Sequence, residues 1–176
     1  MNEPLRVVVA DDHPLFREGV IAALRSVPDI QVVGEAADAD GALRLARREV
    51  PDVVLLDLGM PGGGLEATRR IVAACPGSRL VILTASETAD DLLEAVKAGA
   101  SGFVLKGASS EELASVVRAV SAGELYAPPT LAWALLRGRT QPPHPIHSRV
   151  SRLGSGRCWS CWRRVSVTRR SVSGWG

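Results

Sequence analysis

The sequence predicts an α/β fold in which a parallel five-stranded sheet carries helices on both faces. Two observations support this prediction. Five short runs of aliphatic and β-branched residues recur over the first two thirds of the 176 residues, and a segment of helical length and spacing follows each run. Continuous apolar runs of this length are typical of strands buried on both faces. Because such strands alternate with helices, we expect a doubly wound parallel sheet.

Four of the five runs end in polar residues. These runs are LRVVVADD, PDVVLLD, RLVILT and SGFVLK, and they end at Asp11–Asp12, Asp57, Thr84 and Lys106. The carboxyl ends of the strands in a doubly wound sheet meet at one edge, where ligands bind. We therefore expect these polar side chains to form one site. The fifth run, 30–36, carries no such residue and is predicted to be scaffold.

The predicted helices fill the intervals between the runs. Apolar spacing predicts helices over residues 15–25, 40–49, 65–74, 88–98 and 110–122. Ser109 or Ser110 is placed to cap the last helix, and Gly99 and Gly123 lie where two helices should end.

Composition divides the chain into two parts. Residues 1–124 hold all 19 acidic residues and 12 of the 21 basic residues, a net charge of 12 − 19 = −7, whereas the remaining 52 residues hold nine arginines and all four tryptophans. We predict a folded domain at 1–124, a Pro-rich linker at 125–148 and a separate tail at 149–176. The sequence has no signal peptide and no apolar stretch near membrane-spanning length, so we expect a cytoplasmic protein without membrane contact.

The adjacent acids Asp11 and Asp12 indicate a cation site. Two ionised carboxylates at a buried strand end repel each other unless a cation lies between them. Mg²⁺ prefers oxygen ligands and usually takes one or two carboxylates together with phosphate oxygens. The expected ligands are therefore Asp11, Asp12 and Asp57, with the backbone carbonyl of Gly59 in the loop that follows.

The same edge holds the groups that phosphoryl transfer needs. The reaction requires an in-line nucleophile and positive charge around the phosphoryl oxygens. Asp57 is the predicted nucleophile, Lys106 the cation and Thr84 a hydroxyl donor. Singly, an Asp-Asp pair is more often a loop or cap feature, and a lone Thr or Lys at a strand end usually has no role. Their joint placement predicts an aspartyl-phosphate site.

The motifs VVVADDHPLFREGV, VVLLDLGMPGGGLEATR, VILTAS and GASGFVLKGA resemble the receiver domain of bacterial response regulators, and most of all the NarL/FixJ group. The resemblance covers residues 5 to about 122. It implies a flavodoxin-like fold, Mg²⁺ binding by Asp11, Asp12 and Asp57, and phosphorylation of Asp57 by a sensor histidine kinase. It also implies no enzymatic activity beyond the receiver's own phosphoryl transfer and dephosphorylation, and it allows a homodimer.

Further roles rest on this resemblance alone. It implies that Lys106 pairs with the phosphoryl group, that Thr84 is the switch hydroxyl, and that Phe103 is the aromatic residue that turns inward when the hydroxyl moves. An alternating strand equally places Phe103 in the core without any switch role. His13 precedes Pro14 at a helix start, which favours a structural or solvent-facing role over catalysis.

Two features depart from the family. The loop after Asp57 is one residue shorter than in many relatives and holds three glycines at 62–64, so we expect a more mobile loop with weaker metal or kinase recognition. Gly107 follows Lys106 where some receivers carry a cis-proline, so the sequence fixes the presentation of the lysine less firmly.

The tail at 149–176 reads like a gene translated in the wrong frame. Relatives continue into a helix-turn-helix of about 60 residues, yet the tail has no amphipathic helical spacing. Back-translation from the third base of the Val150 codon permits LTPREREVLELLAAGLSNAEIG, one undetermined residue, and RLG, which resembles a LuxR-type DNA-binding domain. Leucine is forced across the Cys–Trp steps at 158–159 and 161–162. We hypothesise a one-base displacement between about 137 and 147, which leaves a disordered remnant without sequence-specific DNA binding.

Two other interpretations of the tail are weaker. His144 and His147 precede the pair Cys158 and Cys161, which are residue types that bind zinc, but a single CxxC in a Pro-rich setting is a weak signal. The arginines and tryptophans also permit nonspecific nucleic-acid binding through phosphates and stacking. Disorder is the simpler expectation.

Two other functions compete with the receiver. Phosphatase-type hydrolases also form an aspartyl-phosphate with Mg²⁺, but they place nucleophile and acid two residues apart on the first strand, whereas this chain has adjacent acids there and the acceptor on a later strand. A binding module that has lost phosphorylation would not need Asp57, Thr84 and Lys106 together.

Overall fold

Five parallel strands form one sheet in the computed structural model, which describes residues 3–85 and 89–127. The strand order is β2-β1-β3-β4-β5, and every neighbouring pair is parallel. The strands are β1 (Leu5–Ala10), β2 (Ile30–Ala36), β3 (Val53–Asp57), β4 (Arg79–Thr84) and β5 (Gly102–Leu105). The predicted doubly wound sheet is confirmed.

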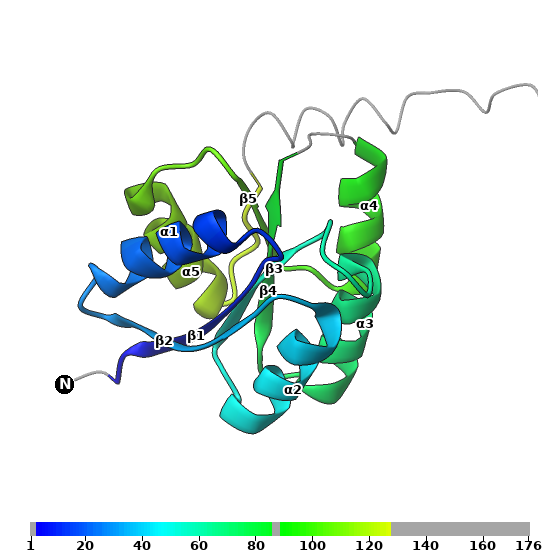
Figure 1. Cartoon of the computed structure of the whole chain (residues 1–176), viewed down its shortest axis with the longest axis horizontal. Helices are drawn as coiled ribbons and strands as arrows, with labels where there is room; N and C mark the ends of the chain where they lie inside the picture. The colour runs from blue at the N-terminus through cyan, green and yellow to red at the C-terminus, as the bar shows by residue number, and fades with distance from the viewer. Residues whose placement is uncertain (1–2, 86–88, 128–176) are drawn as a thin grey trace, which may run out of the picture. The chain divides into compact units, whose positions relative to one another are not determined.

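Helices cover both faces of the sheet (Figure 1). They are α1 (Pro14–Arg25), α2 (Ala39–Glu49), α3 (Gly64–Ala74), α4 (Ala89–Ala98) and α5 (Ser110–Ser121). One layer consists of α1 and α5, and the other of α2, α3 and α4. None of the helices among these residues is both long enough and apolar enough to cross a bilayer.

The strands are apolar throughout because both of their faces are buried. Every residue of β3 is buried, and successive side chains alternate between the two helix layers. Val54 and Leu56 pack with the layer of α2, α3 and α4, whereas Val53 and Leu55 pack with α1 and α5. Burial on both faces explains why the chain shows continuous apolar runs instead of alternation.

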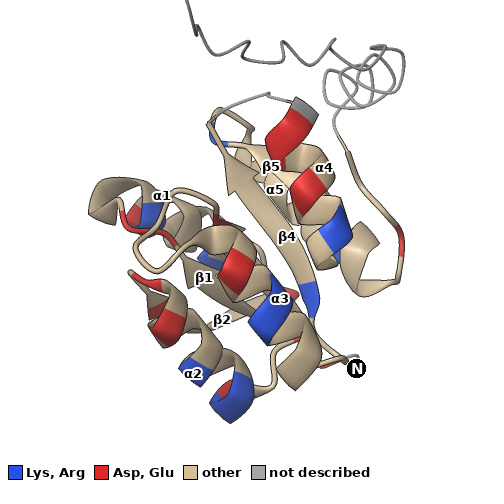
Figure 2. Cartoon of the chain, turned by 90° about the vertical axis from the view of Figure 1, so that its right-hand side faces the viewer, with Lys and Arg blue, Asp and Glu red and all other residues tan. Residues whose placement is uncertain are grey.

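Capping residues define the helix starts. Ser109 caps α5 by accepting a hydrogen bond from the Glu112 amide at 3.2 Å, as predicted. Asp38 caps α2 through the Gly41 amide at 2.7 Å, which starts that helix one residue earlier than expected. Acidic residues occupy the first turn of α4 and a lysine its last turn (Figure 2), in the direction that the helix dipole favours. The expected start of α4 at residue 88 lies outside the described residues.

The chain after α5 returns to the edge of the sheet. Tyr126 forms a parallel bridge with Gly102, its carbonyl accepts from the Phe103 amide at 2.9 Å, and its own amide donates to the Ser101 carbonyl at 3.2 Å. The Tyr126 hydroxyl donates to Glu112 at 3.2 Å. This contact falls within the segment predicted as linker. The rest of that linker and the predicted tail, with its frameshift and its alternative zinc site, lie outside the described residues.

Candidate functional site

Four neighbouring strands bring their polar ends to one edge of the sheet. Asp57 is the last residue of β3 and Thr84 the last of β4, while Asp11 and Lys106 directly follow β1 and β5. The strand register aligns these ends through the pairs Ala10–Leu56, Asp57–Leu83 and Thr84–Leu105. Residues from distant parts of the sequence therefore meet in one place, as the fold prediction required.

Lys106 lies between two buried carboxylates. Its Nζ is 2.8 Å from Asp11 Oδ2 and 3.2 Å from Asp57 Oδ1, and its side chain is 16% exposed. Burial alone would lower the pKa of Lys106, but its interactions with Asp11 and Asp57 outweigh burial and raise that pKa. The lysine therefore stays protonated and supplies fixed positive charge beside Asp57.

The acidic residues at this edge form a cluster with cation-binding geometry. Ligand atoms of Asp11, Asp12, His13 and Asp57 all lie within 4.8 Å of one another. Asp11 Oδ2 lies 2.8 Å from Lys106 Nζ and Asp12 Oδ1 lies 2.8 Å from His13 Nδ1. One lysine faces three carboxylates at this edge, and the excess negative charge is costly where it is buried. A bound divalent cation would offset that cost, so the residues present fit a Mg²⁺ site.

A cavity of about 380 Å³ opens beside Asp57. Its lining residues come from the strand ends, from the loop after β3 and from two helices: His13, Asp57, Leu58, Gly59, Leu65, Thr84, Ala85, Asp91 and Lys106. A Cβ built on Gly59 would lie 3.4 Å from Asp57 Oδ2, so the backbone of this predicted carbonyl donor runs beside the acceptor. The cavity is large enough for a phosphoryl group with a hydrated cation.

Thr84 and Phe103 lie on the same face of the sheet. Phe103 pairs with Ile82 in the register, and Thr84 follows two residues after Ile82, so their side chains share the layer of α3 and α4. Thr84 is 5% exposed and Phe103 3% exposed. Phe103 packs in the core cluster of that layer. Phe103 is therefore a core residue, which is one of the two roles that the sequence allowed. Its switch role stays a prediction.

The loop after Asp57 turns tightly through its three glycines. Gly62 and Gly63 have positive φ angles of 92° and 81°. A Cβ on Gly64 would lie 2.4 Å from Leu58 Cα and 2.5 Å from the Asp57 carbonyl oxygen, and the Gly64 amide donates to the Leu58 carbonyl at 3.2 Å. Only glycine fits where the start of α3 passes this close to the acceptor strand. The predicted mobility of the loop stays a prediction.

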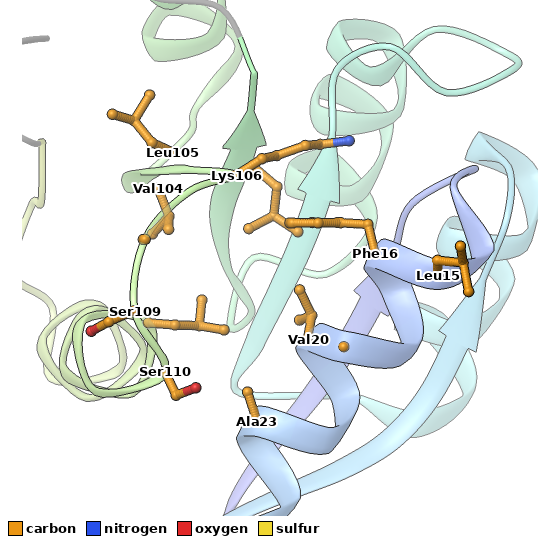
Figure 3. A pocket seen from close by; sticks show the side chains of 13 residues that line it. Leu15, Phe16, Val20, Ala23, Val104, Leu105, Lys106, Ser109 and Ser110 are labelled. Carbon is orange, nitrogen blue, oxygen red and sulfur yellow. The ribbon is translucent and has the colours of Figure 1, made fainter.

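Two residues of the site were not predicted. Asp91 lines the cavity from the first turn of α4. The Phe16 ring of α1 lies 4.9 Å from Lys106 Nζ and borders a second hollow of about 220 Å³ between α1 and α5 (Figure 3). Acids are common in first helical turns and apolar residues on helix faces. No sequence signal therefore separated Asp91 or Phe16 from structural residues of the same kind.

Comparisons with known proteins agree with this geometry. The sequence profile described as the response regulator receiver domain matches residues 7–118. The response regulator GacA of Pseudomonas aeruginosa is 41% identical over 139 residues, which cover 78% of this chain and 65% of GacA. The nitrate/nitrite response regulator NarL of Escherichia coli is 34% identical over 156 residues, which cover 86% of this chain and 72% of NarL.

Solved structures show the same similarity. A two-component response regulator of the LuxR family from Aurantimonas superposes with a TM-score of 0.74 at 38% identity, covering 79% of this chain and all of that chain. The receiver thus accounts for the shared fold, whereas the chain spans slightly less than two thirds of GacA.

Proposed function

The chain belongs to the response regulator receiver family, and from this premise we propose that Asp57 accepts a phosphoryl group from a phosphohistidine of a sensor histidine kinase. The observation that carries the proposal is the meeting of Asp11, Asp57, Thr84 and Lys106 at one sheet edge beside an open cavity. Each of these groups supplies one requirement of phosphoryl transfer to a carboxylate.

Asp57 is the nucleophile of the proposed transfer. A carboxylate oxygen of Asp57 attacks phosphorus, an O–P bond forms, and the P–N bond to the donor histidine breaks, with the electron pair leaving on that nitrogen. Lys106, already 3.2 Å from Asp57 Oδ1, pairs with a phosphoryl oxygen. The Thr84 hydroxyl donates a hydrogen bond to another. Hydrolysis of the acyl phosphate by water returns Asp57 to its carboxylate form.

The acidic residues complete the site by holding Mg²⁺. Asp11, Asp12 and Asp57 would supply carboxylate ligands, and Gly59 its backbone carbonyl. Bound Mg²⁺ supplies positive charge that offsets the charge of the phosphoryl oxygens. The excess of three carboxylates over the one lysine at this edge supports this assignment.

The proposed switch couples the site to the β5 edge. When Thr84 turns toward the phosphoryl group it leaves space on the sheet face that it shares with Phe103. Phe103 adjusts to that space, which shifts the population between two packings of the surface around α4 and β5. The Phe103 amide binds the Tyr126 carbonyl, so this shift reaches the segment that leads out of the receiver.

The proposed output is control of transcription. We place the receiver at 1–124, the linker at 125–148 and an out-of-frame helix-turn-helix remnant at 149–176. An in-frame relative would bind DNA through that domain, as a homodimer, in the cytoplasm. The displaced reading frame of the tail, with its forced leucines at two Cys–Trp steps, supports this assignment.

An assay of turnover separates the receiver from a hydrolase. The full chain is incubated with Mg²⁺ and a chromogenic phosphoester, and separately with a small acyl phosphate. A receiver holds at most one phosphoryl group per chain at any time when it reacts with the acyl phosphate, and it does not turn over the ester. Sustained multiple turnover of the ester that is lost in Asp57→Asn would contradict the proposal and identify a hydrolase.

A further inference from the structure

His13 lies inside the carboxylate cluster, although the sequence favoured a structural or solvent-facing role for it. Its Nδ1 is 2.8 Å from Asp12 Oδ1 and 3.3 Å from Asp11 Oδ1. The His13 amide donates to Asp11 Oδ1 at 2.8 Å, which holds the residue at the N-cap of α1. The imidazole caps no amide of that helix. The contacts of the ring are therefore directed to the acids, and capping does not explain them.

The donor atoms have the spacing of ligands around one ion. Bonds of about 2.1 Å place adjacent ligands about 3.0 Å apart around an octahedral ion and about 3.4 Å apart around a tetrahedral one. Of the two distances from His13 Nδ1, 3.3 Å falls in this range and 2.8 Å is about 0.2 Å below it. Asp57 completes a group of four ligand atoms that lie within 4.8 Å of one another. Asp11, with 0% exposure, is the buried member of this group.

We propose that His13 Nδ1 is a further metal ligand of this site, so that the site also takes borderline transition ions of the Zn²⁺ class and not only Mg²⁺. This inference rests on the metal site of the proposed function. Imidazole suits Zn²⁺, whereas Mg²⁺ takes oxygen ligands and retains its waters. The ion would bind the lone pair of Nδ1, with the ring proton on Nε2. The His13 side chain is 68% exposed, so that nitrogen can donate to water.

Zn²⁺ bound at this site would hinder the phosphorylation of Asp57. An ion held by Asp11, Asp12, His13 and Asp57 has four side-chain ligands, whereas the proposed Mg²⁺ site has three side-chain ligands and one backbone carbonyl. Zn²⁺ is most often four-coordinate in closed sites. The consequence is that Zn²⁺ and phosphorylation of Asp57 compete.

The test measures binding of Zn²⁺ and Mg²⁺ to the full chain by calorimetry. The chain has three histidines, and two of them, His144 and His147, lie with Cys158 and Cys161 in the alternative zinc motif. A background variant replaces these histidines with alanine and these cysteines with serine. His13 is then the only histidine, so its imidazole ¹⁵N signals identify ligation without ambiguity.

In this background, we expect Zn²⁺ to shift the His13 Nδ1 resonance and Mg²⁺ to leave it in place. His13→Asn should weaken Zn²⁺ binding by about tenfold or more, and the loss for Zn²⁺ should exceed that for Mg²⁺ by a similar factor. Asp57→Asn should weaken both ions, which ties both to the same site. His13→Gln, which also lacks the imidazole, guards against an effect specific to one replacement.

Three results would overturn the inference: an unshifted Nδ1 at saturating Zn²⁺, equal losses for the two ions in His13→Asn, or Zn²⁺ binding that survives Asp57→Asn unchanged. If Mg²⁺ still binds and the acyl phosphate still modifies Asp57, these results refute the role of His13 alone. If neither ion binds the background variant, the metal site of the proposed function fails with it.

Discussion

At the scale of single residues, the site depends on charge balance among buried groups. Asp11 is fully buried and Asp57 nearly so, and Lys106 is the one lysine or arginine among the described residues that forms an ion pair with either of them. The sequence predicts these identities because each residue ends an apolar run. It could not predict the ring of Phe16 beside Lys106 Nζ, since that contact joins α1 to the end of β5 across the fold.

Lys106→Met should slow phosphorylation of Asp57 by an acyl phosphate on the order of 10²-fold, because one preorganised cation is lost from the phosphoryl oxygens. Mg²⁺ affinity should rise, since a positive charge beside the carboxylates is removed. Rapid-quench phosphorylation rates and calorimetry check both effects. Lys97→Met, at an exposed lysine of α4 that pairs with Glu94, is the matched control and should change neither. Equal rates in the two variants would contradict the role of Lys106.

The raised pKa of Lys106 also predicts a pH dependence of stability. A cation whose pKa is raised by folding stabilises the folded state below its usual value of 10.5, and this contribution is lost as pH rises through the folded value. Above pH 10.5 the free energy of unfolding of the wild type should therefore fall more steeply than that of Lys106→Met. Burial and Glu112 raise the pKa of Tyr126, so its ionisation also lowers the free energy of unfolding at high pH. This effect is the same in both proteins and cancels in the comparison. If the free energies of unfolding of the two proteins fell in parallel with pH, the ion pairs of Lys106 with Asp11 and Asp57 would not stabilise the fold.

At the scale of elements, the sequence predicts the five strands and five helices within a residue or two because the signals are local. Apolar runs mark the strands, and Ser109 caps α5 as expected. The helix α2 starts one residue earlier than predicted, because Asp38 caps it through the Gly41 amide. The close passage of Gly64 over Leu58 was not predicted, since it depends on how a shortened loop turns between β3 and α3.

Gly64→Ala should destabilise the receiver by about 1–3 kcal/mol, because its Cβ would overlap backbone atoms that cannot move aside like a flexible side chain. Gly77→Ala is the matched control: a Cβ there meets nothing within 4 Å, and the free energy of unfolding should change by less than about 0.5 kcal/mol. Urea unfolding followed by circular dichroism gives both values. A Gly64→Ala variant as stable as Gly77→Ala would show that the loop does not turn in this way.

At the scale of the whole molecule, contacts with the sheet continue past residue 124 into the proposed linker. Tyr126 adds two backbone hydrogen bonds to the β5 edge and a side-chain hydrogen bond to Glu112. The charge break after residue 124 marks a change in composition, but composition cannot show that a few further residues bind a sheet edge.

The frameshift interpretation of 149–176 rests on the codon argument, and resequencing the coding DNA tests it: DNA that confirms the printed frame would indicate a true mutation instead of a reading error.

A chain ending at residue 124 should melt several degrees below one ending at residue 127, because it loses two backbone hydrogen bonds worth about 1 kcal/mol each. The longer truncation keeps both of these hydrogen bonds and is the reference for the comparison. Thermal denaturation by circular dichroism measures both melting temperatures. Equal melting temperatures for the two truncated chains would mean that Tyr126 contributes nothing to the β5 edge.

The central claim is that Asp57 is the phosphoryl acceptor of a receiver. The most direct measurement is intact mass after incubation of the full chain with a small acyl phosphate and Mg²⁺, on the wild type, on Asp57→Asn and on Asp40→Asn, which alters an exposed carboxylate paired with Arg70. The wild type and Asp40→Asn should each gain the mass of one phosphoryl group, and Asp57→Asn should gain none. No gain in the wild type, or an equal gain in Asp57→Asn, would contradict the claim.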